Sequence, residues 1–188
     1  MNNKKRPKLV NLADFGLRGF NYYWTRKERY KINDVELKSV GVSDGNAYVD
    51  ESLIKPLKKV NQALFQHGLE LIVKDAYRSS ELYKMIQKKR YKVRGKAETD
   101  KLLNLETMPH STGLAVDVGL IDLKSGKELM MRNSKDDPEA FFVEYYRNKL
   151  DDQSQEYQQL QELLISAMKR VGFSIGSNGE FWHFELTK

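Results

Sequence analysis

The sequence predicts an α+β fold: a small, mainly antiparallel sheet flanked by helices. Short segments with the period-two alternation of strands stand among longer segments with helical spacing, without the regular strand–helix–strand order of a parallel sheet. The last two expected strands are separated only by a short Gly/Ser/Asn turn, which is typical of an antiparallel hairpin.

The first half of the chain is expected to hold two helices with a strand between them. Ser52 can cap the first helix, and Gly68 lies past its end. Its apolar stripe consists of Leu53, Leu57, Val60 and Leu64. A strand over 69–73 then leads into a loop over 75–79.

A second helix is expected over 80–90, followed by a long, irregular connection to Asn104. From Gly113 to Ile121, apolar residues alternate with small or polar ones, which predicts a strand with one buried face. Asp117 projects from the opposite face of that strand.

The remaining elements complete the sheet and its helices. A helix is expected over 139–147, and another with an apolar stripe runs from Glu156 to Val171. The hairpin follows, with strands over 173–175 and 181–186.

The length of 188 residues fits one domain, since a chain of this size buries roughly 70% of its unfolded surface. Internal repeats, low-complexity tracts and linker-like segments are absent from the sequence. We therefore expect residues 1–188 to form a single domain, with residues 1–8 as a flexible basic N-terminus.

The composition indicates a protein without a membrane span. Hydrophobic residues make up 40% and charged residues 31%, and no stretch approaches the ~20 apolar residues that a membrane helix needs. Asn11 and Asp14 interrupt the segment where a signal peptide would have its apolar region, so cytoplasmic rather than periplasmic residence is expected. The lack of cysteine excludes disulfides and thiolate metal ligands.

The net charge of +6 permits binding to nucleic acid, an anionic membrane or an anionic cell-wall polymer. Its densest basic run, over 84–96, is interpreted as a solvated helix face leading into a loop. Only Tyr83 and Tyr91 accompany it, without a nucleic-acid-binding motif, so no nucleic-acid partner is expected.

Two of the three histidines stand near carboxylates and suggest a metal site. A hydrolytic zinc site typically has three protein ligands and an open position for water. His110, Asp117 and His183 supply such a set, and Glu180 is left as a spare carboxylate. His67 stands instead at a helix C-terminus, where a cation interacts favourably with the helix dipole.

Strand geometry constrains this site. Residues an odd number apart in a strand face opposite sides, so Glu180 must lie at the mouth of the strand that carries His183. His110, seven residues before Asp117, must likewise lie on the loop ahead of its strand. The site is therefore expected at one edge of the sheet.

Hydrolysis of a carbonyl compound follows from these parts. Glu180 would take a proton from a zinc-bound water that attacks the carbonyl carbon and would pass it to the leaving amine. Arg78, in a loop directly after a strand, would stabilise the negative charge of the intermediate. The structural alternatives are an ion pair for Asp117, a turn-exit position for Glu180, and a surface or helix-end contact for Arg78.

The segments His110–Asp117 and Glu180–His183, preceded by Asp75–Arg78, together resemble the zinc D-alanyl-D-alanine peptidases. The pattern is His-Ser-x-Gly-x-Ala-x-Asp followed by Glu-x-Trp-His. The Asp-x-Tyr-Arg segment resembles the VanX-type dipeptidase branch in particular. The similarity runs from the aromatic pair Tyr22-Tyr23 to the last strand.

The resemblance implies one zinc ion per chain, held by His110, Asp117 and His183. It implies Glu180 as the catalytic base and Arg78 as the transition-state arginine. The expected reaction is hydrolysis of the free dipeptide D-alanyl-D-alanine in the cytoplasm.

For substrate contacts, the resemblance points to Asp137, which would hold the amino terminus, and to Tyr23. The chain departs from the family at Met108, where a serine is usual, and at Phe181, where a tryptophan is common. The loss of the serine hydroxyl leaves substrate choice open.

Two alternatives therefore remain. One is a D,D-carboxypeptidase or endopeptidase acting on peptidoglycan stem peptides, and the other is a non-catalytic zinc-binding module. The sequence leaves the oligomeric state open.

Overall fold

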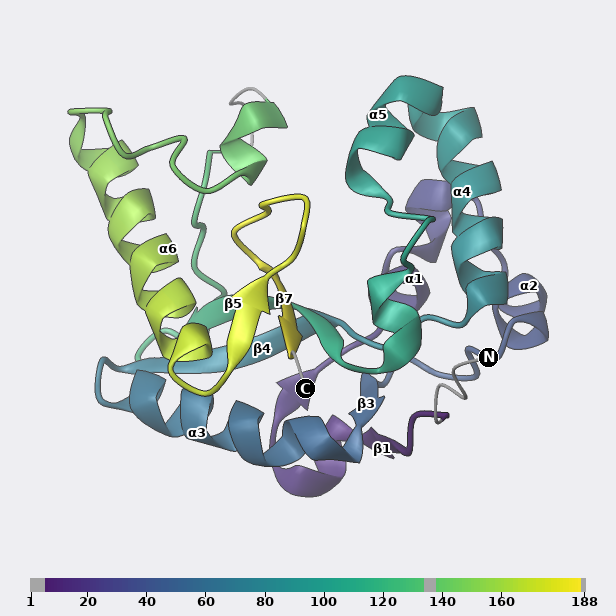
Figure 1. Cartoon of the computed structure of the whole chain (residues 1–188), viewed down its shortest axis with the longest axis horizontal. Coiled ribbons are helices and arrows are strands. Elements are labelled where there is room, and N and C mark those ends of the chain that lie inside the picture. Colours follow the sequence, from purple (N-terminus) through teal and green to yellow (C-terminus); the bar gives the residue numbers. More distant parts are fainter. Residues whose placement is uncertain (1–5, 134–137, 187–188) are drawn as a thin grey trace. The chain divides into compact units, whose positions relative to one another are not determined.

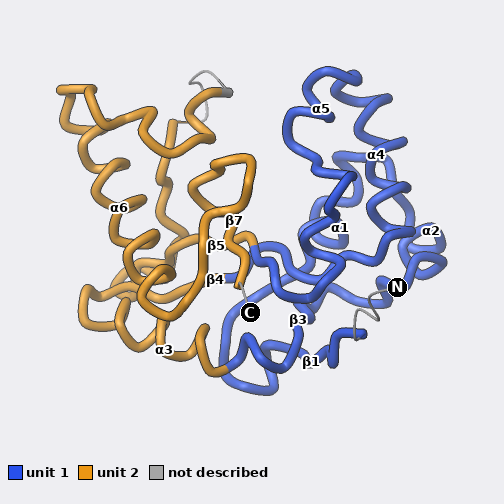
Figure 2. The backbone as a smooth tube through the Cα atoms, in the orientation of Figure 1, with its two compact units in different colours: residues 1–54, 73–116 blue, residues 55–72, 117–188 orange. Residues whose placement is uncertain are grey.

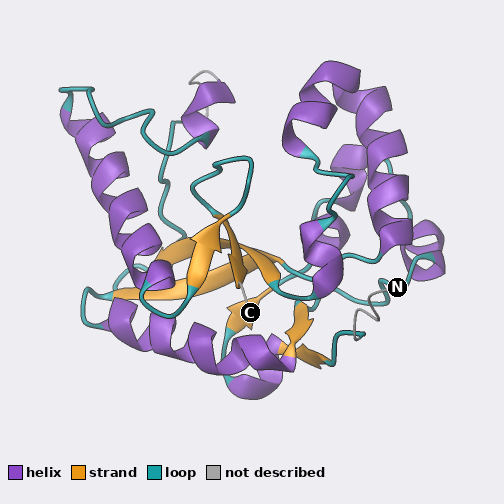
Figure 3. Cartoon of the chain, in the orientation of Figure 1, coloured by secondary structure: helices purple, strands orange, loops and turns teal. Residues whose placement is uncertain are grey.

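The computed structural model describes residues 6–133 and 138–186. Helices and strands alternate irregularly along the chain (Figures 1 and 3). In order, they are β1 (Leu9–Asn11), β2 (Arg18–Gly19), α1 (Tyr22–Thr25), α2 (Asp34–Ser39), β3 (Tyr48–Asp50), α3 (Ile54–Phe65), β4 (Leu69–Asp75), α4 (Ser80–Arg94), α5 (Lys96–Leu102), β5 (Ala115–Asp122), α6 (Asp152–Lys169), β6 (Phe173–Ile175) and β7 (His183–Leu186). Among the described helices, none has the length and apolar character that crossing a membrane requires.

The strands form two sheets. β1 pairs antiparallel with β3, and a five-stranded sheet has the order β2-β4-β5-β7-β6. β6 and β7 form the predicted antiparallel hairpin, in which Phe173 lies opposite Leu186. The predicted α+β class, with a mainly antiparallel sheet flanked by helices, is confirmed.

The chain divides into two compact units (Figure 2). Unit 1 comprises residues 1–54 and 73–116, and unit 2 comprises residues 55–72 and 117–188. The division falls within β4 and β5, so each of these strands has residues in both units. A single domain over 1–188 stays a prediction.

Unit 1 is built around an aromatic and aliphatic core beside α4. Ser79 caps this helix, because its hydroxyl accepts a hydrogen bond from the Leu82 backbone N–H at 3.1 Å. α5 follows directly and packs beside α4 (Figure 1). The buried core comprises Tyr23, Tyr30, Ile32, Leu37, Leu82, Tyr83, Ile86 and Leu103.

Unit 2 contains the hairpin and the longest helix, α6. Asp151 caps α6 by accepting a hydrogen bond from the Ser154 N–H at 2.9 Å. Leu164 and Met168, one turn apart, are fully buried. α3 is joined to β4 by the buried Asn61 side chain, whose Oδ1 accepts from the Leu71 N–H at 2.8 Å.

Two expectations about the first half of the chain are wrong. Ser52 is not the cap of the first helix. Asp50 instead caps a 3-10 helix by accepting a hydrogen bond from the Ser52 N–H, and α3 begins after it at Ile54. The connection after α4 is not irregular, because it contains α5. That helix lacks an apolar stripe and instead forms an i,i+4 ion pair between Lys96 and Asp100.

Two expectations about the second half also need correction. Residues 139–147 do not form a regular helix: a 3-10 turn over Pro138–Phe141 is followed by turns, and Glu144 adopts a left-handed conformation (φ 79°) that interrupts helical backbone. β5 is buried on both faces rather than one, since Ala115 and Gly119 are buried as well as the apolar residues. Asp117 is half-buried.

The contact between α3 and β4 gives a test of the fold. Replacing Asn61 by Ala leaves the buried Leu71 N–H without its acceptor, so we expect Asn61→Ala to lower the free energy of unfolding by about 1–3 kcal/mol. Urea denaturation measures this. Gln62→Ala, at the exposed neighbouring position, is the control, and an equal loss in both variants would contradict the assigned role of the hydrogen bond.

Candidate metal centre

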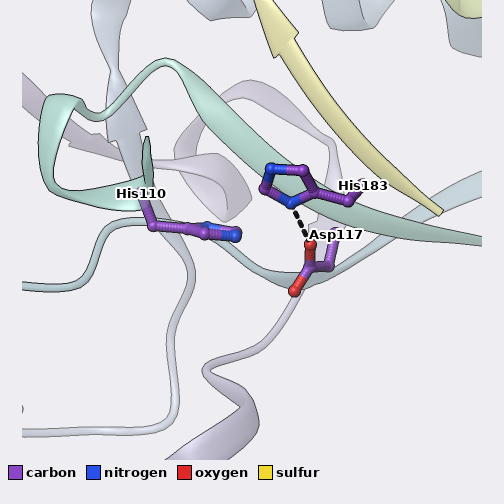
Figure 4. A group of neighbouring side chains, drawn as sticks. All are labelled: His110, Asp117 and His183. Carbon is purple, nitrogen blue, oxygen red and sulfur yellow. Dashed lines mark hydrogen bonds and ion pairs between the residues drawn. The ribbon is translucent and has the colours of Figure 1, made fainter. Parts of the chain in front are cut away.

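Three predicted residues come together in the structure. His110 lies in a 3-10 helix (Pro109–Thr112) ahead of β5, Asp117 lies within β5, and His183 begins β7. One ligand atom from each lies within 4.8 Å of the others. Figure 4 shows the three side chains directed toward one another. As strand parity predicts, His110 lies ahead of β5, whereas Asp117 and His183 lie on strands.

Hydrogen bonds to Ala76, Tyr83 and Arg78 hold His110, whose exposed fraction is 2%. Its Nδ1 lies 2.7 Å from the Ala76 carbonyl oxygen, which can only accept, so Nδ1 carries the proton. Its backbone N–H donates to the Tyr83 hydroxyl oxygen at 3.1 Å, and its carbonyl accepts from the Arg78 N–H at 3.3 Å. The tautomer leaves the Nε2 lone pair for a metal ion.

The backbone around His110 makes a tight turn. Met108 adopts a left-handed conformation (φ 44°), and Pro109 occupies the first helical position, where its missing N–H costs nothing. Gly113 ends the turn at φ 74°, and a Cβ there would lie 3.1 Å from the Asp50 backbone nitrogen. These three residues fix the position of the imidazole.

Carboxylates flank both nitrogens of His183. Nδ1 lies 2.7 Å from Asp117 Oδ1, and Nε2 lies 3.2 Å from Glu185 Oε1. Burial lowers the pKa of His183, but the hydrogen bonds to Asp117 and Glu185 outweigh it and raise the pKa to about 10. Two imidazoles and a carboxylate, placed this close together, are a donor set that suits zinc.

Glu180 is buried three residues before the start of β7. It is not one of the three grouped ligands, but its charge lies near enough to His183 to contribute to the raised pKa. Its carbonyl accepts from the His183 N–H at 3.2 Å, and its backbone forms an antiparallel bridge with Phe142. Glu180 therefore stands at the mouth of the strand, as parity predicts.

Arg78 follows β4 and has an exposed fraction of 8%. Its Nε and Nη2 lie 2.9 and 2.8 Å from Asp75 Oδ2, and Asp75 is also buried. The guanidinium carbon lies 5.4 Å from the Tyr23 ring centre and 5.2 Å from that of Tyr83. The carboxylate partner of Arg78 is thus buried rather than on the surface.

Residues 22–188 match the family model described as D-ala-D-ala dipeptidase. The chain belongs to this peptidase family. The expectation of an enzyme of the zinc D-Ala-D-Ala peptidase class is therefore confirmed at the level of the family. Among curated proteins, no sequence matches the chain significantly.

Two solved structures share the fold of this chain at low sequence identity. The vancomycin-resistance D,D-pentapeptidase VanY in complex with Zn(II) has a TM-score of 0.50 and 17% identity, over 76% of this chain and 74% of that one. VanYB in complex with D-alanine-D-alanine has a TM-score of 0.50 and 18% identity, over 76% and 73%. The LdcB LD-carboxypeptidase has a TM-score of 0.47 and 19% identity, over 74% of this chain but only 59% of its own length.

Of the two residues expected to contact the substrate, the structure describes only Tyr23. Tyr23 lies in α1 and is buried beside Arg78. Met108, at the usual serine position, packs against the aromatic core of unit 1. Asp137 lies outside the described residues.

Two neighbours of His183 in unit 2 were missed by the sequence analysis. Glu185 stands two residues after His183 and shares its strand face, so strand parity could have revealed it. Gly176 could not be found this way: a Cβ there would lie 2.1 Å from His183 Cδ2, so the ring rests directly on the Gly176 backbone. The pairing of Asp75 with Arg78 was also missed, although the two residues stand only three positions apart in the sequence.

Glu185 should influence metal affinity, because a partner on one imidazole nitrogen orients the other toward the metal. We expect Glu185→Ala to weaken zinc binding about 10- to 100-fold, and Glu185→Gln, which keeps an acceptor oxygen, to weaken it less. Competition with a chromophoric chelator measures the affinity. Glu162→Ala, an exposed carboxylate of α6, is the control. Unchanged affinity in Glu185→Ala would rule out the orienting role.

Proposed function

We propose that this chain is a zinc-dependent dipeptidase of the VanX type that hydrolyses D-alanyl-D-alanine in the cytoplasm, with one zinc ion per chain. The observation that carries the proposal is the convergence of His110, Asp117 and His183, with the buried Glu180 beside them. A non-catalytic module would need the three ligands but not a buried carboxylate at the mouth of β7 or a buried arginine after β4.

The donor set fits a catalytic metal. A zinc ion held by His110, Asp117 and His183 would lower the pKa of a water molecule and polarise the substrate carbonyl. His110 serves as a ligand through Nε2, because its Nδ1–H is donated to Ala76. Glu185 and the Gly176 backbone hold the His183 ring in place.

Glu180 and Arg78 have different roles in the proposed reaction. Glu180 accepts a proton from the attacking water and returns it to the leaving amine. Arg78 stabilises the negative charge that develops on the carbonyl oxygen. Asp75 holds the guanidinium by two of its N–H groups, so little side-chain entropy is lost when Arg78 meets that oxygen.

A specific observation also favours a second candidate, hydrolysis of the terminal D-Ala from longer stem peptides. The fold is similar to that of VanY, a D,D-pentapeptidase, and to VanYB bound to D-alanine-D-alanine. Both candidates require the same metal ligands, base and arginine. They differ in what faces the amino side of the scissile bond, where we propose that Asp137 and Tyr23 contact the substrate.

Substitution of Glu180 tests the proposed hydrolysis reaction. We expect Glu180→Ala to lower kcat on D-Ala-D-Ala about 10²- to 10⁴-fold, because the proton acceptor is removed, while zinc content stays unchanged. The same assay with a stem pentapeptide separates the two candidates: cleavage of the pentapeptide alone would reject the dipeptidase. Glu156→Ala on the exposed face of α6 is the control. Full activity in Glu180→Ala would refute the mechanism.

Substitution of Arg78 tests whether this residue stabilises the negative charge on the carbonyl oxygen. We expect Arg78→Lys to lower kcat about 10²- to 10³-fold, because a compact ammonium lacks the planar guanidinium that binds Asp75 through Nε and Nη2 and directs its other N–H groups elsewhere. Steady-state kinetics at constant zinc occupancy measures this. Arg94→Lys, nearer the end of α4, should retain activity, and an equal loss in both variants would argue for a general effect on unit 1.

A further inference from the structure

Unit 1 contains a cavity that the proposed reaction does not use. Its volume is about 290 Å³, roughly that of ten water molecules in the liquid. The loop that follows α2, the start of β3 and residues just before and within α4 form most of its wall. Among the described residues that line it there is no metal ligand, and neither Glu180 nor Arg78.

Hydrogen bonds hold the wall of this cavity in place. The Ser79 hydroxyl donates to the Val40 carbonyl at 2.9 Å, and the Tyr77 N–H donates to the Tyr48 carbonyl at 2.9 Å. Both bonds tie the loop over 40–47 and the strand after it to the segment that follows β4. The cavity is therefore largely formed before a ligand enters, which lowers the entropy cost of binding.

Asp44 is the one charged residue among the described residues that line the cavity. Its Oδ1 accepts from the Asn46 N–H at 2.9 Å, and its Oδ2 accepts from the Tyr48 hydroxyl at 3.1 Å. Burial, and next the hydrogen bond to Asp44, raise the pKa of Tyr48, so this hydroxyl is a neutral donor near pH 7. In the part of the chain that the structure describes, no lysine, arginine or histidine pairs with Asp44, so its charge is left for a cation.

The rest of the wall offers aliphatic and aromatic surface. Val40, Val42 and Leu82 supply aliphatic groups, and Leu82 is fully buried. Tyr48 and Tyr77, both half-buried, supply two aromatic rings. Aromatic rings attract ammonium groups through cation–π interactions, and a carboxylate beside them compensates the positive charge.

These features select one class of cation. A divalent metal ion such as Ca²⁺ takes about six to eight oxygen ligands, and a single carboxylate in a largely apolar wall does not supply them. A free amino acid carries a carboxylate as well, and the described lining residues include no lysine, arginine or histidine to compensate it. An amine with an apolar group matches both the single negative charge and the wall.

We propose that this cavity binds a small organic ammonium ion, with Asp44 as its counter-ion and the aliphatic and tyrosine side chains around its carbon skeleton. The inference does not depend on the proposed peptidase activity. Ala76 belongs to the surroundings of both sites: it lines the cavity, and its carbonyl oxygen accepts the proton of His110 Nδ1 at 2.7 Å. A bound amine would therefore lie against the segment that supports this histidine.

The test is calorimetric titration of the whole chain with three probes of similar size. Phenethylamine carries an ammonium group, 2-phenylethanol is its neutral counterpart, and phenylalanine adds a carboxylate. Phenethylamine is expected to bind with a dissociation constant of about 0.1–1 mM, the range of a good ligand with so few atoms. The other two probes should bind about 10-fold more weakly or less, because each lacks one half of the match.

Substitutions of the lining residues locate the site. Asp44→Asn should raise the dissociation constant of phenethylamine about 10-fold and leave that of 2-phenylethanol unchanged, because the amide keeps an acceptor for the Asn46 N–H but loses the charge. Tyr77→Leu removes one ring and should weaken phenethylamine binding about 2- to 30-fold. Glu106→Gln, at an exposed position of the same unit, is the matched control and should bind like the wild type.

Each contrary result would overturn the ammonium site. These results are the absence of phenethylamine binding, equal binding of all three probes, unchanged affinity in Asp44→Asn, and displacement of phenethylamine by D-Ala-D-Ala, which would place the amine in the substrate site. If Asp44→Asn does not fold, as judged by thermal unfolding, the comparison of amine and alcohol on the wild type decides. Because binding is measured without turnover, a failure of the peptidase assay would leave this result unaffected.

Discussion

The hydrogen bonds that join His110 to Ala76, Arg78 and Tyr83 are the constraint on which the site residues of unit 1 depend. They join a 3-10 helix, the loop after β4 and the first turns of α4 through Ala76, Arg78 and Tyr83. Each such bond contributes only about 1 kcal/mol net, but breaking one would leave a buried polar group without a partner. The metal ligand and the catalytic arginine are therefore positioned as one assembly, although 32 residues separate them in the sequence.

Charge compensation is the second organising feature. Arg78 is paired with the buried Asp75, and His183 is paired with Asp117 and with the partly exposed Glu185. A buried charge without a partner destabilises the fold by several kcal/mol, so the residues that hold the functional groups are as much part of the site as the groups themselves.

Period-two geometry was enough to predict where His110, Asp117, Glu180 and His183 lie relative to their strands, because alternation is a property of the backbone. It could not predict that the His183 ring rests on Gly176, since that contact depends on how two strands of the hairpin pack. The sequence pattern also missed α5, whose helix is supported by charge pairs rather than an apolar stripe. The helix predicted over 139–147 is interrupted by the left-handed backbone at Glu144.

The two ends of the substrate differ in what they reveal about its length. A terminal carboxylate is common to the free dipeptide and to a stem peptide ending in D-Ala-D-Ala, so a group that reads it selects for a free end without measuring the length of the chain. Substrate length must instead be recognised on the amino side, where only the dipeptide has an ammonium group on the residue that precedes the scissile bond. A carboxylate such as Asp137 could recognise that ammonium, whereas Met108, which has replaced a polar side chain and packs into the aromatic core, could not. Selectivity between the two substrates is therefore expected to respond to substitutions at Asp137.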